Sequence, residues 1–112
     1  MAKKVVEDAL IVHKTEVVFY DKFEERHYRL NANNIKKVIY DYAILKTFFG
    51  LKKELVERIV FTVDDPDIPS ELVVYEFEEP NFRRFRGGLR TFLEDNKIAV
   101  EIKDVEGNIT NN

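Results

Sequence analysis

The sequence has 112 residues, a formal net charge of −3, 45% hydrophobic residues and no cysteine. This length predicts one domain with a core of its own, which we place at residues 1–106, followed by a flexible polar tail at 107–112. The lack of cysteine excludes disulfides, cysteine-ligated metals and thiol nucleophiles, and the acidic balance disfavours general nucleic-acid binding.

The first part of the chain has the composition of a sheet. Residues 17–20 are β-branched and aromatic, so residues 5–20 fit one long strand or a hairpin. In order, we then expect a turn at 21–25, a strand at 26–30, an asparagine-rich turn at 31–34 and a strand at 35–42.

The middle of the chain supports two interpretations. Its aromatic and β-branched content favours a strand at 43–49, a turn at Gly50 and one helical turn at 52–55. The alternative is a helix over part of 41–58. It has support because apolar residues recur there at helical spacing, namely Ile44, Phe48, Leu51, Leu55 and Ile59.

The last third predicts strands around one helix. We expect strands at 59–63 and 71–78, a loop at 64–70, and a final strand where Ile98, Val100 and Ile102 alternate with polar or small residues. Apolar residues three and four apart predict an amphipathic helix over about residues 81–95, namely Phe82, Phe85, Leu89, Phe92 and Leu93. Pro80 fits its first turn, Glu78 and Glu79 fit its positive end, and Asn96 fits its C-cap.

These elements predict an α+β fold. A lone amphipathic helix must bury its apolar side, and a sheet is the available surface. We therefore expect an antiparallel, strongly curved sheet or partly open barrel of about seven strands, closed by the helix at 81–95 and followed by an edge strand.

The layout resembles the pleckstrin-homology-like superfold in its bacterial versions. The segment 34–40 is similar to a strand of that fold, the strand ending in Tyr75-Glu76-Phe77 precedes the helix as it does there, and Phe85, Leu89 and Phe92 resemble the helix that plugs its barrel. The strand at 98–102 departs from that pattern, because the helix usually ends the domain. The resemblance implies a module that binds proteins, peptides or lipids rather than an enzyme.

Four arginines on the predicted helix are the candidate ligand-binding residues: Arg83, Arg84, Arg86 and Arg90. Guanidinium groups near a helix N-terminus suit phosphate or carboxylate ligands. The alternative is a solvated helix face whose arginines meet the acidic residues of segment 64–79.

The pair Gly87-Gly88 lies inside the same helix and weakens it by roughly 2 kcal/mol. Either the helix backbone approaches a strand closely or kinks there, or the glycines leave room for a ligand beside the arginines.

Two other groups of residues are of the types that bind metals, but their spacing does not predict a metal site. Asp65 and Asp67 begin like a calcium loop and Glu76 follows Asp65 by eleven residues, but Pro69 and Ser70 replace residues that such a loop requires. His13 and His27 lie too far apart for a helical metal pair, although adjacent strands could bring them together. We expect no metal, no cofactor and no catalytic site.

The sequence therefore predicts a non-enzymatic binding or scaffold module with a protein or peptide partner, with self-association through a free C-terminal strand edge as one route. The alternative is an anion-binding domain whose arginines meet lipid headgroups at a membrane surface, phosphorylated ligands or nucleic acid. No apolar run of the length that spans a bilayer and no signal-peptide core occurs, so we expect a cytoplasmic protein.

Overall fold

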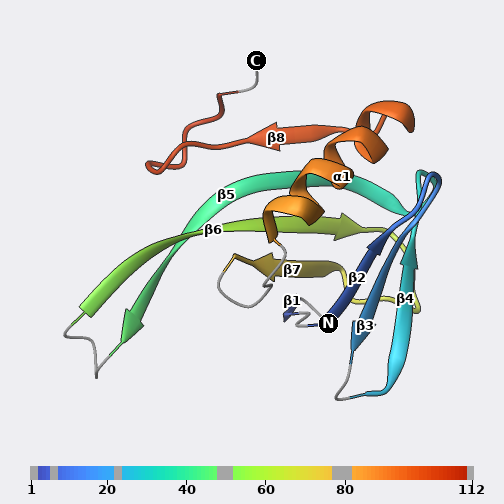
Figure 1. Cartoon of the computed structure of the whole chain (residues 1–112), viewed down its shortest axis with the longest axis horizontal. Coiled ribbons are helices and arrows are strands. Elements are labelled where there is room, and N and C mark those ends of the chain that lie inside the picture. Colours follow the sequence, from blue (N-terminus) through green and yellow to red (C-terminus); the bar gives the residue numbers. More distant parts are fainter. Residues whose placement is uncertain (1–2, 6–7, 22–23, 48–51, 77–81, 111–112) are drawn as a thin grey trace.

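The computed structural model describes residues 3–5, 8–21, 24–47, 52–76 and 82–110. Within them, eight strands form two sheets, and one helix packs against both (Figure 1). The elements are β1 (Lys3–Val5), β2 (Asp8–Val12), β3 (Val17–Asp21), β4 (Arg26–Leu30), β5 (Ile35–Thr47), β6 (Lys52–Val63), β7 (Glu71–Tyr75), α1 (Phe82–Asp95) and β8 (Val100–Ile102).

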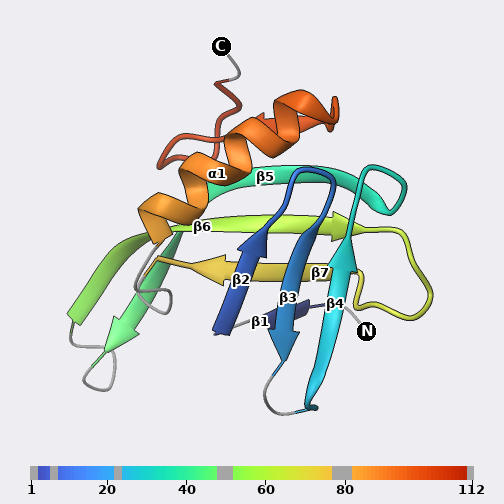
Figure 2. The same cartoon turned by 45° about the vertical axis from the view of Figure 1, so that its right-hand side comes forward.

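The two sheets are separate, so the predicted α+β class is confirmed without a closed barrel. The larger sheet has the order β1-β7-β6-β5-β8 and the smaller has the order β2-β3-β4. Their strands cross steeply, and α1 lies beside both (Figure 2). The predicted antiparallel pairing does not extend to the two margins of the larger sheet, because β1 runs parallel to β7 and β8 runs parallel to β5. Neither β1 and β7 nor β5 and β8 are consecutive in the chain. No hairpin therefore imposes an antiparallel direction on these pairs.

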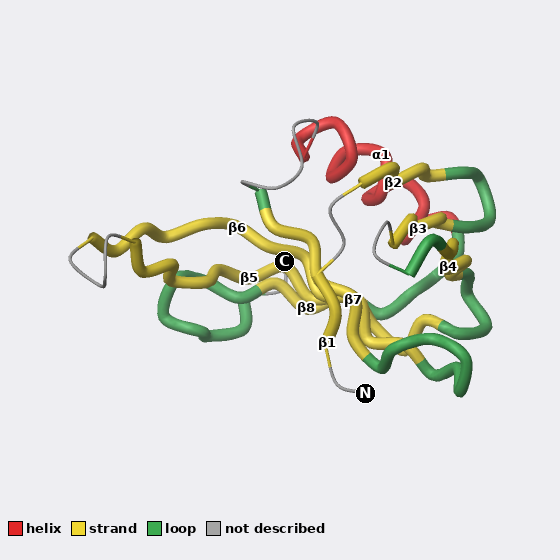
Figure 3. Tube along the Cα trace, turned by 90° about the horizontal axis from the view of Figure 1, so that it is seen from below, coloured by secondary structure: helices red, strands yellow, loops and turns green. Residues whose placement is uncertain are grey.

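The middle of the chain is a long hairpin, so the predicted helical turn at 52–55 and the alternative helix over 41–58 are both wrong. Strands β5 and β6 pair from Ile35↔Val63 to Thr47↔Lys52, and their far end projects from the rest of the sheet (Figure 3). Cross-strand hydrogen bonds satisfy the backbone N–H and C=O groups between the two strands. This pairing decides the structure here, although the apolar residues recur at helical spacing. The expected turn at Gly50 lies outside the described residues.

The core is a single apolar cluster that joins both sheets and the helix. Phe61 of β6 packs edge-on against Phe19 of β3, with ring centroids 4.8 Å apart, and its ring centroid lies 6.4 Å from that of Phe85 of α1. The apolar side of α1 is buried here as the sequence predicts at Phe85, Leu89, Phe92 and Leu93, whereas the side chain of Phe82 lies outside the described part of the structure. With its apolar side buried in this way, the helix turns its polar side toward β5 and β8.

The end of α1 has a well-formed cap that directs the chain into β8. The N–H of Ile98 donates to the carbonyl of Leu93 (3.0 Å), and the N–H of Lys97 donates to that of Glu94 (3.3 Å). This pair of bonds is a Schellman motif with Asn96 at the C-cap, as predicted. Lys97 takes the left-handed position, with φ of 54°, where glycine is the usual residue.

The segment after β8 folds back on the strand. The N–H of Thr110 donates to the carbonyl of Ile102 (2.7 Å), and Lys103 forms a bridge with Ile109. The Asp104 carboxylate accepts backbone N–H bonds from Glu106 and Asn108, and the bond from Asn108 is the main cause of its lowered pKa. Residues 107–110 of the expected tail thus contribute to this turn, and residues 111–112 lie outside the described part of the chain.

Replacing Phe61 by alanine should remove the contact between the sheets and the helix. Because the side chain is fully buried, we expect a loss of about 3–5 kcal/mol in the free energy of unfolding, measured by urea denaturation. The control is Val105→Ala at an exposed position, which should change it by less than about 0.5 kcal/mol. A comparable small loss for Phe61→Ala would contradict this description of the core.

Replacing Lys97 by glycine should stabilise the protein by up to about 1 kcal/mol, because glycine adopts the left-handed conformation without steric cost. The comparison variant is Lys97→Ala, which removes the charge but keeps the Cβ atom, and it should gain little. Equal urea midpoints for both variants would show that the backbone at this position is not strained.

Candidate functional site

One face of α1 carries a row of polar residues. At about 100° per residue, spacings of three, four and seven place Arg83, Arg86, Gly87 and Arg90 on one side of the helix. Arg84 lies about 100° around the helix from Arg83 and points elsewhere. The structure therefore brings three of the four predicted site residues together and leaves Arg84 apart.

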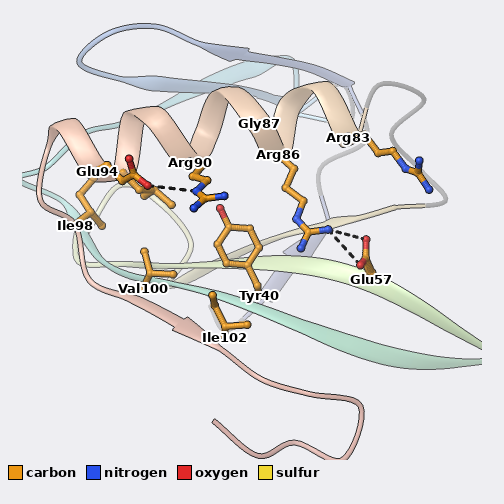
Figure 4. A pocket seen from close by; sticks show the side chains of 11 residues that line it. Tyr40, Glu57, Arg83, Arg86, Gly87, Arg90, Glu94, Ile98, Val100 and Ile102 are labelled. Carbon is orange, nitrogen blue, oxygen red and sulfur yellow. Dashed lines mark hydrogen bonds and ion pairs between the residues drawn. The ribbon is translucent and has the colours of Figure 1, made fainter. Parts of the chain in front are cut away.

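This face looks across an open groove toward β5 and β8 (Figure 4). The groove has a volume of about 860 Å³. Besides the residues of the polar row, its lining comprises Tyr40, Glu57, Leu93, Glu94, Ile98, Val100 and Ile102. We call this space the α1–β8 groove. Arginines thus line its helix side, and aliphatic side chains form its floor.

The strand register explains this floor. Ile102 of β8 lies beside Tyr40 of β5, and Val100 lies beside Val38, so alternate residues of both strands face the helix. Ile98 enters the groove directly after the helix cap. The parallel pairing of β8 with β5 therefore places side chains of β8 in the groove. The sequence predicted this segment only as an edge strand.

Arg86 is the arginine most firmly held in the groove. Its Nη1 donates to both carboxylate oxygens of Glu57 on β6, at 3.2 and 3.1 Å. Its guanidinium carbon also lies 5.7 Å from the centre of the Tyr40 ring, within cation–π range. The side chain of Arg86 thus bridges helix and sheet across the groove.

The remaining arginines are held less firmly. Arg90 pairs with Glu94 at 3.3 Å, but the two side chains are 81% and 68% exposed. Such a pair contributes less than about 0.5 kcal/mol. Arg83 and Arg84 are exposed, and neither forms an ion pair with any residue that the structure describes. The predicted partners in 64–79 are wrong for Arg86 and Arg90, whose glutamates come from β6 and from α1 itself.

Tyr40 points its hydroxyl from β5 toward the helix, near Arg90 (Figure 4). Burial raises the pKa of this hydroxyl to about 12, although the positive charges of Arg86 and Arg90 act in the opposite direction. No hydrogen-bond partner for it occurs among the described residues. It therefore stays protonated at neutral pH and can donate a hydrogen bond to a group bound in the groove.

The two glycines of α1 have different surroundings. A Cβ atom at Gly87 would meet no atom of the described residues within 4 Å, whereas one at Gly88 would lie 3.9 Å from the Cβ of Val12, an ordinary contact. Close approach to a strand therefore does not require Gly87. Because Gly87 lines the groove, the interpretation that it leaves space there stands beside that of a kink.

The other sequence candidates form no such site. Within the described ranges, no three histidine, aspartate or glutamate side chains gather in a way that could hold a metal ion. Asp65 accepts the N–H of Asp67 within the loop, and His27 lies against Tyr20, with ring centroids 4.9 Å apart.

The sequence reasoning missed Tyr40, Glu57 and the apolar floor. A signal for Tyr40 existed, because strand alternation places Val38, Tyr40 and Tyr42 on one face. The sequence did not identify Glu57 as a groove residue, because the region around it is predicted partly as helix. The position of the floor depended on where β8 joins the sheet, which no local pattern encodes.

Comparisons with known protein families, curated proteins and solved structures give no match. Across the described ranges, α1 is too short and too polar to cross a membrane.

Tyr40 should titrate above the usual range of a tyrosine hydroxyl. We expect a step near pH 12 in a spectrophotometric titration that Tyr40→Phe removes. Because the raised pKa favours the folded state only while the hydroxyl is protonated, its contribution to stability is complete below pH 10 and declines between about pH 10 and 12. A Tyr40→Phe variant that leaves the late step in place would contradict the burial of this hydroxyl.

Proposed function

We propose that this protein is a non-enzymatic binding module whose α1–β8 groove receives a peptide segment of a partner protein. The observation that carries the proposal is the combination of an arginine-lined wall and an aliphatic floor in one open groove. Its volume of about 860 Å³ lies in the range of ligand sites. Aliphatic surface supplies burial, and arginines supply orientation through charge-assisted hydrogen bonds.

The groove is better suited to this role than the edge of β8. Residues 109–110 already contact the outer side of that strand, through the Lys103–Ile109 bridge and the bond from Thr110 to Ile102. An incoming strand would have to displace them before pairing. Self-association through this edge therefore has less support than binding in the groove.

The resemblance to pleckstrin-homology-like domains is consistent with this role and remains part of the proposal. The order of strands followed by one helix that packs against the sheets supports the resemblance. The two separate sheets and the parallel pairing of β8 depart from the pattern of that superfold. A cytoplasmic location is likewise proposed.

The proposal is tested by selecting, from a random peptide display library, peptides that bind the whole protein. Two adjacent residues give a matched pair of variants: Arg83 lines the groove and Arg84 does not, while both are exposed and without an ion pair among the described residues. We expect Arg83→Glu to lower the affinity of the protein for the selected peptides about tenfold, and Arg84→Glu to leave this affinity nearly unchanged. A library that yields no binder, or equal losses for both variants, would argue against a peptide groove.

The second candidate is an anion-binding surface for lipid headgroups, phosphorylated ligands or nucleic acid. The guanidinium groups of Arg83 and Arg84, which have no ion-pair partner among the described residues, favour it. Vesicles containing phosphatidylserine and single-stranded oligonucleotides, each at low and physiological salt, distinguish it from the groove. A charged surface would bind them in a salt-dependent way and would depend on Arg83 and Arg84 alike.

A further inference from the structure

The groove has a notch at its centre where a bound anion would fit. Arg86 and Arg90 extend on either side of Gly87, and the hydroxyl of Tyr40 faces the helix from below (Figure 4). A side chain at position 87 would project into this space, where, apart from the adjacent residues and the backbone of the helix, no atom of the described residues lies within 4 Å of the Cβ position. We call this space the Gly87 notch.

We propose that the Gly87 notch binds a single carboxylate that lies next to an aliphatic side chain of the ligand. This inference rests on the proposed peptide-binding function and specifies what the peptide presents. Guanidinium groups and a phenol donate hydrogen bonds, and a carboxylate oxygen accepts them. Ile98, Val100 and Ile102 then cover the neighbouring aliphatic group.

The charges of the groove favour one negative charge over two. Its lining holds three arginines and two glutamates, and because Arg86 pairs with Glu57 and Arg90 with Glu94, the excess positive charge of the groove corresponds to Arg83. A carboxylate neutralises that charge, whereas a phosphate dianion exceeds it. Arg90 can turn to the ligand at small cost, because its pair with Glu94 is largely exposed.

Gly87 is the specificity-determining residue in this arrangement. A glycine inside a helix is unfavourable relative to alanine, and the packing around Gly87 does not call for one. A function that needs the vacant volume explains why a destabilising residue lies at this position. Gly88 provides the matched control, since it is next in the chain and does not line the groove.

The experiment uses synthetic decapeptides with blocked ends, in which one glutamate and one leucine lie one to four positions apart in a serine background. Fluorescence anisotropy with the whole protein measures binding, and parallel peptides carry glutamine in place of glutamate. A further peptide with glutamine and a free C-terminal carboxylate shows whether the carboxylate comes from a side chain or from a chain terminus.

We expect the glutamine peptides with blocked ends to bind about tenfold more weakly, and Tyr40→Phe to weaken the glutamate peptides several-fold. Gly87→Ala and Gly88→Ala should both raise the midpoint of thermal unfolding by roughly 4 °C, but only Gly87→Ala should weaken binding. Equal binding of glutamine and glutamate peptides, or equal affinity of the two glycine variants, would overturn the notch while leaving the peptide groove in place. Failure of all the peptides, together with an unproductive library selection, would count against the proposed function itself.

Discussion

The structure depends on the contact of three aromatic rings, one from each of its layers. Phe61 lies between Phe19 of the small sheet and Phe85 of the helix. The two sheets share no strand pairing among the described residues, so apolar contact is what holds them together. The helix is part of that contact, and its position is therefore fixed by the core rather than by its own marginal helical propensity.

The α1–β8 groove follows from this burial. Once the apolar side of α1 is fixed against the sheets, the arginine row beside it must face the open side of β5, and the cap at Asn96 and Lys97 directs the chain into β8 along that strand. The same helix thus stabilises the core with one side and forms the wall of the groove with the other. The lining of the groove comes from α1, the paired strands β5, β6 and β8, and the segment between α1 and β8, which under the proposed function limits the ordering cost of binding.

Local patterns identified the helix, its buried stripe, its C-cap and strand β4, because each depends on residues that are close in sequence. They failed at residues 52–55, where pairing with a distant strand overrides helical spacing. Helical spacing alone already separates Arg84 from Arg83, Arg86 and Arg90, although the four were grouped as one cluster. The partner Glu57 and the floor residue Ile102 belong to tertiary structure, since strand order decides what faces a helix.

Native-state hydrogen exchange tests most directly whether the core and the groove wall are one unit. If α1 is held by both sheets, the amides of Leu89 and Phe92 should exchange as slowly as those of Phe19 and Phe61, by global unfolding. If the helix amides exchange orders of magnitude faster while both sheets stay protected, α1 opens independently. The groove would then lack a fixed wall, and this account of the protein would be contradicted.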